Sequence, residues 1–330
     1  MSAEAVRAAV SERFPDAVVD GNGSESTLEP ATNEFVIFSK PELGRLDERD
    51  QAALWDLFAR SFADYGVTVD RLRVLTGSEL DRTGVMAQHY GVINQISRLG
   101  RPALTEAAEQ ALQDLLGDQA AEAAVLGGHQ FLDHHAEFSP FTLGILFANA
   151  KVTRLGPGTY AATVRIDGDP VTILNGFHPR QLSFFTARDT VCAFLHASSG
   201  TDWEVLRSEL IGATDPSQAK QTSIRGTLYA DPGAFGLSAV SSNFNGVHMS
   251  AGPLEGLGEL DRFFGDGRPV TDWAFARALL DAGASADDVT AYLGNPVIQG
   301  NGKRGTAFDL TEGCNAVPAA QLLALAERVV

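Results

Sequence analysis

One histidine has the sequence surroundings that a nucleophile needs. His248 lies in the stretch Asn245-Gly246-Val247-His248-Met249-Ser250, and Glu259 follows eleven residues later. A glycine-containing turn lets an imidazole reach a ligand, and a carboxylate from the following segment can hold the ring in one tautomer. Because the unperturbed pKa of histidine is about 6.5, a neutral ring keeps a lone pair for attack near pH 7. We therefore predict that His248 is the nucleophile and that Glu259 orients it.

A buried strand is the first element that must support this stretch. Residues 34–39 form a short β-branched and aromatic run that ends at Lys40-Pro41-Glu42, which predicts a strand with Lys40 at its carboxyl end. The same patterns predict helices at 49–65, 84–99, 104–116, 119–126, 177–185, 203–210, 257–264, 272–282, after the N-cap Ser285 and at 318–329, strands at 67–75 and 190–195, and a hairpin at 159–174. The N-terminal residues 1–30 are expected to form a helix followed by a polar loop.

The composition is that of a folded, acidic protein. Of 330 residues, 44% are hydrophobic and 20% charged, which suffices for a sizeable core. The net charge of −17 repels nucleic-acid backbones and anionic lipid, so neither nucleic acid nor membrane is an expected partner. Cys192 and Cys314 are expected to be reduced thiols, and no apolar stretch approaches the roughly 20 residues of a membrane span. We expect a cytoplasmic protein.

Several short motifs occur in the order in which the nucleoside diphosphate kinase family carries them. That family has Lys-Pro-Asp after its first strand, His-Tyr on an early helix, Gly-x-Thr-Asn-Pro, Ile-Arg-Gly, and Asn-x-x-His-Gly-Ser with a later glutamate. This chain has Lys40-Pro41-Glu42, His89-Tyr90, Gly212-Ala213-Thr214-Asp215-Pro216, Ile224-Arg225-Gly226, Asn245 to Ser250 around His248, and Glu259. It therefore resembles the family over residues 34–99, 177–228 and 243–264.

The resemblance implies a fold and a reaction. The fold would be an α+β, ferredoxin-like sandwich, and the reaction a ping-pong phosphoryl transfer through a phosphohistidine at His248. ATP or another nucleoside triphosphate would be the donor, with Mg²⁺ bound mainly by its phosphates and by water. The residues that the resemblance places around the phosphates are Lys40, Thr214, Arg225, Asn245 and Ser250.

The chain also departs from the family pattern. The family has an arginine six residues before the threonine, where this chain has Ser208, with Arg207 one place earlier; either the helix shifts to present Arg207 or one phosphate contact is missing. Met249 replaces a glycine and is expected to crowd the turn. The insertion Arg101 to Phe177 falls in the helical hairpin whose rim stacks the nucleobase in the family, so Tyr90 and Phe177 are only candidates for that contact.

These segments define the expected domain organisation. It comprises an N-terminal helix and loop (1–33), the first part of the kinase-like domain (34–100), a helical and β-hairpin insertion (101–176), the second part with the catalytic histidine (177–266), and a helical C-terminal extension (267–330). Family members commonly assemble into homo-oligomers, and an insertion of this size could block those contacts.

Other polar clusters are better explained without chemistry. His129, His134 and His135 with Asp133 do not have the spacing of metal ligands, so we predict no protein-held metal. The segment 300–305, with Lys303 and Arg304, lacks the pattern of a phosphate-binding loop and is expected to be a turn. His89 is expected to pack beside Tyr90, and the other histidines, His178 and His196, are given no role.

The sequence leaves the acceptor open. A nucleotide or a specialised small molecule could receive the phosphoryl group, because the insertion, Ser208 and the C-terminal extension all alter the acceptor end of the site. A nucleotidyltransferase of a specialised pathway is a close alternative. A nucleotide-binding regulatory or scaffold protein without turnover is another, favoured by Met249 and Ser208 and disfavoured by the retention of His248 and Glu259.

Overall fold

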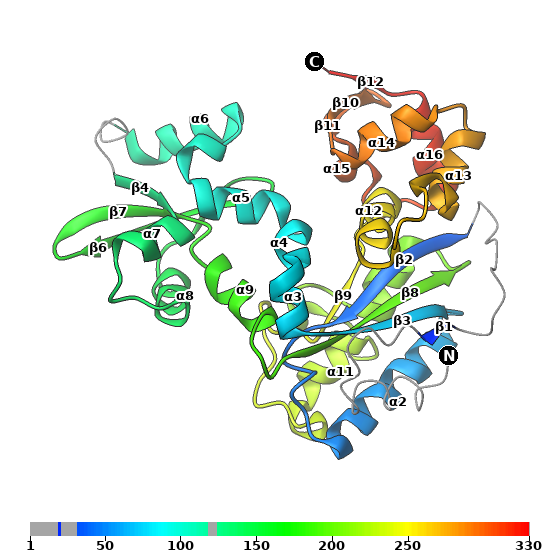
Figure 1. The fold of residues 1–330 in the computed structure, drawn as a ribbon, viewed down its shortest axis with the longest axis horizontal. Coiled ribbons are helices and arrows are strands. Elements are labelled where there is room, and N and C mark those ends of the chain that lie inside the picture. Colours follow the sequence, from blue (N-terminus) through cyan, green and yellow to red (C-terminus); the bar gives the residue numbers. More distant parts are fainter. Residues whose placement is uncertain (1–18, 21–31, 118–123, 330) are drawn as a thin grey trace. The chain divides into compact units, whose positions relative to one another are not determined.

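A computed structural model describes residues 19–20, 32–117 and 124–329 (Figure 1). The chain forms two compact units, one made of residues 78–188 and the other of the residues on both sides, 1–77 and 189–330. The helix expected within residues 1–30 lies outside the described residues. The architecture is mixed α+β, as predicted. The two units are called the sheet unit (1–77 and 189–330) and the inserted unit (78–188) below.

A five-stranded antiparallel sheet is the centre of the sheet unit, with the strand order β1-β3-β8-β2-β9. The strands are β1 (Val19–Asp20), β2 (Asn33–Ser39), β3 (Thr68–Thr76), β8 (Val191–Ser199) and β9 (Val247–Met249). The strands predicted at 34–39, 67–75 and 190–195 are therefore confirmed as β2, β3 and most of β8. The strands β2 and β8 are buried along their whole length, which explains the uninterrupted apolar runs 35–38 and 191–195 within them.

Alternation along β2 separates the two faces of this sheet. Phe35 and Ile37 join a core that also contains residues of α2 (Glu48–Asp64) and α11 (Ile224–Ala230). Phe38 points to the other face, where it packs against Phe194 and against Phe263 of α12 (Pro253–Phe264). In Figure 1, α2 and α11 accordingly lie on one side of the sheet and α12 on the other.

A second group of helices follows α12. It consists of α13 (Ala274–Asp281), α14 (Ala286–Leu293), α15 (Ala307–Thr311) and α16 (Ala316–Ala324), with a small sheet of β10 (Val297–Gly300), β11 (Lys303–Thr306) and β12 (Glu327–Arg328). Ser285 caps α14 by accepting from the Asp288 N–H, as expected. The helix predicted at 318–329 is shorter than expected, because the chain turns at Leu325 and pairs with β10 through β12.

The inserted unit has its own four-stranded sheet, in the order β4-β7-β6-β5. Its elements are β4 (Ala124–Gly127), β5 (Thr153–Gly156), β6 (Thr159–Ile166), β7 (Asp169–Leu174), α3 (Gly77–Thr83), α4 (Val85–His89), α5 (Gly91–Leu99), α6 (Glu106–Leu116), α7 (Gly128–His134), α8 (Pro140–Asn149) and α9 (His178–Phe185). The predicted hairpin is confirmed as β6–β7, with Asp167 and Gly168 at positive φ in the turn.

One helix prediction in the inserted unit was wrong. The alanine-rich segment 119–126 is expected to be helical, yet its described residues 124–126 belong to β4. Val125 and Leu126 pair in parallel with Thr172 and Ile173 of β7, so pairing with a distant strand overrides the local helix propensity.

The inserted unit leaves and re-enters the sheet unit at neighbouring positions. Thr76 at the end of β3 pairs with Val191 at the start of β8, and the Gly77 N–H donates to the Thr190 carbonyl at 2.8 Å. Strands β3 and β8 are therefore paired up to the point where residues 78–188 begin and end.

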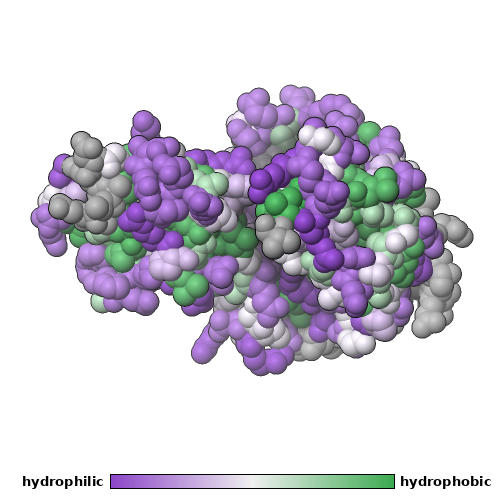
Figure 2. Space-filling model, turned by 90° about the horizontal axis from the view of Figure 1, so that it is seen from above, coloured by the Kyte–Doolittle hydropathy of each residue, from purple (hydrophilic) through white to green (hydrophobic). Residues whose placement is uncertain are grey.

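The surface and the helices show two further properties. On the face seen in Figure 2, hydrophilic side chains dominate and hydrophobic ones form smaller groups between them. None of the helices in the described part of the chain combines the length and the apolarity that crossing a bilayer requires.

Candidate active site

His248 lies on β9, the edge strand of the main sheet, directly opposite Phe38 of β2. Paired residues share a sheet face, and the two rings stack with their centroids 4.3 Å apart and an interplanar angle of 18°. The His248 side chain is 19% exposed. The stretch predicted as a turn is thus partly a strand, preceded by Gly246 at a φ of 80°, and this alternation sends Met249 into the core on the opposite face instead of crowding the histidine.

Glu259 holds the imidazole from α12. Nε2 of His248 lies 2.8 Å from Oε1 of Glu259, whose side chain is 1% exposed. The second oxygen of Glu259 accepts from the Ser250 hydroxyl at 2.5 Å, and that hydroxyl oxygen also accepts from the Val36 N–H at 3.0 Å. The carboxylate is therefore fixed to β2 and β9, and a proton on Nε2 of His248 places the ring's lone pair on Nδ1.

Burial sets the protonation state of this histidine. Desolvation, the largest cause, lowers the pKa of His248 to about 3, and the positive field of Lys40, Arg225 and Arg207 acts in the same direction. The field of Glu255 opposes the shift but does not cancel it. The imidazole is consequently neutral near pH 7, which is the nucleophilic form.

Lys40 and Glu42 flank the glycine that precedes β9. The Lys40 N–H donates to the Gly246 carbonyl at 2.8 Å, and Oε1 of Glu42 accepts from the Gly246 N–H at 2.8 Å. Burial lowers the pKa of Lys40 to about 8 and raises that of Glu42. The charge of the predicted Lys40 therefore acts on His248. Its lowered pKa means that the ammonium group loses its proton more readily than an ordinary lysine does.

Arg225 and Asn245 fix the backbone around His248. Arg225 donates from its two terminal nitrogens to the carbonyls of Gly212 and Val247, both at 2.9 Å, while its buried Nε has no partner among the described residues. Burial lowers the pKa of Arg225 to about 10. The buried Asn245 donates to the Thr214 carbonyl at 2.9 Å, and in the part of the chain that the structure describes its own side-chain oxygen accepts no hydrogen bond. Both side chains link the loop at 212–214 to β9.

The structure presents Arg207, not Ser208, to the site. Residues Leu206–Ile211 form a π-helical turn, whose wider spacing shifts the register of the side chains. Arg207 reaches the Ala251 carbonyl at 3.3 Å, next to Ser250, whereas the Ser208 hydroxyl donates to the Glu204 carbonyl of its own helix. A register shift of this kind is not readable from residue spacing alone.

Glu255 is a further carboxylate beside His248 that was not among the residues predicted from the sequence. This residue stands one turn before Glu259 on α12, and its carboxylate accepts from the Ala251 N–H at 2.6 Å. Desolvation, followed by the charge of Glu259, raises the pKa of Glu255 to about 7. It was missed because the helix was expected to begin at Leu257; Pro253, a residue type favoured in the first helical turn, was the signal for the earlier start.

Tyr90 and Phe177 belong to the inserted unit. The Tyr90 ring contacts the rings of His89, His178 and Phe185, with centroid distances of 4.6, 5.9 and 6.0 Å. Phe177 packs against Phe147 and Tyr160 in the core of that unit. His89 thus packs beside Tyr90, as expected, and Phe177 contributes to the core of the inserted unit.

The remaining histidines of the inserted unit have separate partners. His129 lies 2.9 Å from the Ser97 hydroxyl, His134 lies 2.8 Å from the Gln130 carbonyl, and His135 pairs with Glu137. Burial lowers the pKa of His129 and of His178 to about 4. Each of the three histidines considered as ligands therefore has a polar partner within the inserted unit.

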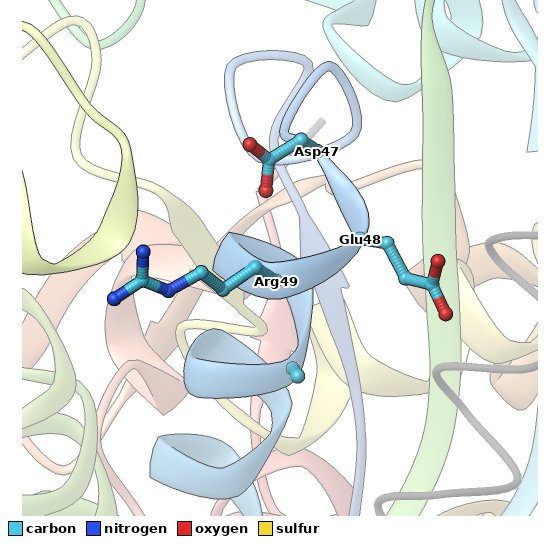
Figure 3. A pocket seen from close by; sticks show the side chains of 4 residues that line it. Asp47, Glu48 and Arg49 are labelled. Carbon is cyan, nitrogen blue, oxygen red and sulfur yellow. The ribbon is translucent and has the colours of Figure 1, made fainter.

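A shallow depression at the start of α2 carries no such chemistry. It is lined by Asp47, Glu48, Arg49 and Ala52, and in Figure 3 the three charged side chains point away from one another. Asp47 caps α2 by accepting from the Asp50 N–H at 2.9 Å. None of these residues belongs to the cluster around His248, so the hollow and the polar site are different places on the sheet unit.

Comparison with known proteins adds no assignment: no protein-family model and no curated protein matches this chain.

Proposed function

We propose that the protein is a phosphotransferase that takes the terminal phosphoryl group of a nucleoside triphosphate onto Nδ1 of His248. The observation that carries the proposal is the pairing of Nε2 with the buried Glu259 at 2.8 Å beside three cationic side chains, Lys40, Arg207 and Arg225. An imidazole that is neutral, held in one tautomer and surrounded by cations has what an attack on a phosphate requires.

The reaction would proceed in two displacements. The Nδ1 lone pair attacks the terminal phosphorus, the bond to the bridging oxygen breaks, and the nucleoside diphosphate leaves with that electron pair. The ring becomes a phosphorylated imidazolium whose Nε2 proton is held by Glu259. An acceptor oxygen or nitrogen then attacks the phosphorus and releases any proton it carries to water. The P–N bond breaks with its electron pair returning to Nδ1, and the neutral histidine is restored.

The cations have two roles in this proposal: some contact the phosphate oxygens, and one holds the backbone around His248. Lys40 and Arg207 are the side chains proposed to neutralise phosphate oxygens, whereas Arg225 contributes its buried charge while holding Gly212 and Val247. Thr214 is exposed on the loop that Asn245 fixes and is proposed as a nucleotide contact. Since both oxygens of Glu259 already accept hydrogen bonds, Mg²⁺ would be held by the nucleotide's phosphates and by water.

The order of the strands supports a ferredoxin-like sandwich as the finer description of the fold. Apart from the short β1, the order is β3-β8-β2-β9, and all pairs are antiparallel. Helices follow the first strand (α2) and the third (α10, Trp203–Val205, continuing into the π-helical turn), as in two interleaved β-α-β units. Residues 78–188 would then be an insertion between the second and third strands.

The experiment is incubation with ATP labelled at the γ position, followed by gel separation without acid. The proposal expects one labelled group per chain, stable in alkali, labile in acid, and absent from His248→Asn. His134→Asn is the matched control, because this exposed histidine of the inserted unit hydrogen-bonds to the Gln130 carbonyl of its own helix. Label that persists in His248→Asn would refute the proposed nucleophile.

Two other outcomes would identify the alternatives. Transfer of label from the α phosphate, with release of pyrophosphate, would indicate a nucleotidyltransferase. Nucleotide binding without any labelling would indicate a regulatory or scaffold protein, an alternative favoured by the engagement of Arg207 by Glu312 and of Arg225 by backbone carbonyls. The acceptor would be sought by adding nucleoside diphosphates, alcohols, amines and carboxylic acids to the labelled protein.

A further inference from the structure

The C-terminal helical region contacts the chain immediately after the proposed catalytic strand. The Gly313 N–H donates to the Ala251 carbonyl at 2.9 Å. Gly252 lies so close to the Thr311 carbonyl that an added Cβ would be only 2.5 Å from its oxygen. Residues 311–313 therefore pack backbone to backbone against residues 251–252, one residue beyond Ser250.

A second anchor fixes the other end of this segment. The Asn315 side-chain oxygen accepts from the Trp203 N–H at 2.8 Å and from the Asn33 amide at 3.0 Å. The Ala316 N–H in turn donates to the Asn33 side-chain oxygen at 3.0 Å. Because the chain is held on both sides, Glu312 has a defined place at the edge of the site and is not on a loose loop.

Glu312 makes an ion pair with the arginine that the proposed function uses. Its Oε1 lies 2.6 Å from Nη1 of Arg207, and the same nitrogen reaches the Ala251 carbonyl at 3.3 Å. The two side chains are 36% and 49% exposed, for Arg207 and Glu312 respectively. A pair this exposed contributes little to stability and is readily exchanged for a better ligand.

A phosphate group is such a ligand. It offers a guanidinium several acceptor oxygens in the geometry that favours paired hydrogen bonds, and it carries more charge than a carboxylate. We propose that Glu312 acts as an anionic gate, occupying Arg207 until a phosphate of the nucleotide displaces it. This inference rests on the proposed function, and it makes Glu312 a specificity-determining residue that disfavours ligands too weakly charged to take its place.

The test measures binding of Mg-ADP by calorimetry at low ionic strength. Glu312→Gln keeps the shape of the side chain and removes its charge, so the gate predicts a Kd lowered about two- to fivefold. Asp309→Asn is the matched control, because it removes one exposed charge from neighbouring α15 without an ion pair in the described structure. Adenosine, which has no phosphate, should bind both variants as it binds the unaltered protein.

A double-mutant cycle completes the test. In an Arg207→Gln background the effect of Glu312→Gln should vanish, since no guanidinium remains to be released. A Kd that stays unchanged or rises in Glu312→Gln, or an equal fall in Asp309→Asn, would overturn the gate while leaving the phosphotransferase intact. If neither the unaltered protein nor Glu312→Gln binds Mg-ADP, both the gate and the proposed function fail.

Discussion

The main sheet carries two histidine–glutamate pairs on one face, and they share a similar hydrogen bond but differ in their surroundings. Nε2 of His248 lies 2.8 Å from Glu259, and Nε2 of His196 on β8 lies 2.9 Å from Glu34 on β2. His196 is paired with Val36 in the sheet and His248 with Phe38, so both histidines point to the side covered by α12.

The surroundings of the two pairs differ, and they favour a structural role for His196–Glu34 and a chemical role for His248–Glu259. The His196 side chain is 7% exposed, and its buried Nδ1 has no partner within the described ranges. Its ring and that of Trp273 are in a T-shaped contact with centroids 5.4 Å apart. The second oxygen of Glu34 accepts from the Ala274 N–H at 2.7 Å, which ties α13 to the sheet. His248 instead sits at the sheet edge in the field of Lys40, Arg207 and Arg225. A histidine–glutamate pair becomes a phosphoryl-transfer candidate through nearby cations and access, not through the pair itself.

The largest expected effect concerns the carboxylates. Glu259→Gln should slow formation of the phosphohistidine by at least about 100-fold, because the imidazolium that forms would lose its counter-charge. Glu34→Gln should leave that rate within about twofold, since Glu34 serves His196 and Ala274. Rapid-quench labelling with ATP measures both. Equal losses in the two variants would mean that the pairs do not differ in function.

The free energy of unfolding, unlike the labelling rate, should respond to substitution of Glu34. Glu34→Ala removes a partner from two buried groups, His196 and the Ala274 N–H, and should lower the free energy of unfolding by about 3 kcal/mol. Glu34→Gln, whose amide oxygen can still accept from Ala274, should cost about 1 kcal/mol. Urea denaturation followed by circular dichroism measures the difference. A loss below about 0.5 kcal/mol in Glu34→Ala would contradict a structural role for this pair.

The pH dependence tests one of the three cations whose field acts on His248. Burial lowers the pKa of Lys40 from 10.5 to about 8, so the folded protein loses this positive charge as the pH rises through about 8. The labelling rate at low ATP should therefore fall on the alkaline side. Lys40→Arg should move the fall to higher pH, because arginine keeps its proton there. An identical alkaline fall in both proteins would assign it to another group.

As the pH rises, deprotonation of Lys40 should lower the labelling rate but raise the contribution of this residue to the free energy of unfolding. Between about pH 8 and 10.5 the unfolded chain still holds a proton on Lys40 that the folded protein has released. The burial penalty is thus relieved, and the contribution of Lys40 to stability improves, as the pH rises through this window. The expected loss of activity above pH 8 would accordingly not be caused by unfolding at this residue.

The smallest expected effect concerns the aromatic rings that pack against His248 and His196. Phe38→Leu removes the face that stacks on His248 and should slow labelling about threefold, with a stability loss of about 1 kcal/mol. Trp273→Phe changes the ring beside His196 and should leave labelling unchanged. The two labelling rates, measured together, show whether stacking orients only the proposed nucleophile.

The sequence predicts the parts of this site that depend on local spacing. The short apolar run of β2 and the Lys40-Pro41 that ends it place Lys40 at the strand end, and His248 and Glu259, eleven residues apart, lie within a hydrogen bond. Contacts made by distant segments are not predictable in this way. Glu312 meets Arg207 only through the packing of residues 311–316, and β4 forms only because β7 offers it a parallel partner. The placement of Arg207 beside Ala251 depends on the π-helical turn at Leu206–Ile211, and spacing in the sequence does not predict such a turn.

The branching of residues 78–188 between β3 and β8 also bears on how the chain is made. Strand β8 lies between β2 and β3 in the sheet, so these two cannot be joined until β8 has left the ribosome. At typical rates of synthesis, the intervening unit occupies about 5–20 s, during which it has time to fold first. Strands β2 and β3 must wait through that interval with unpaired edges, which exposes them to aggregation at this stage of biosynthesis.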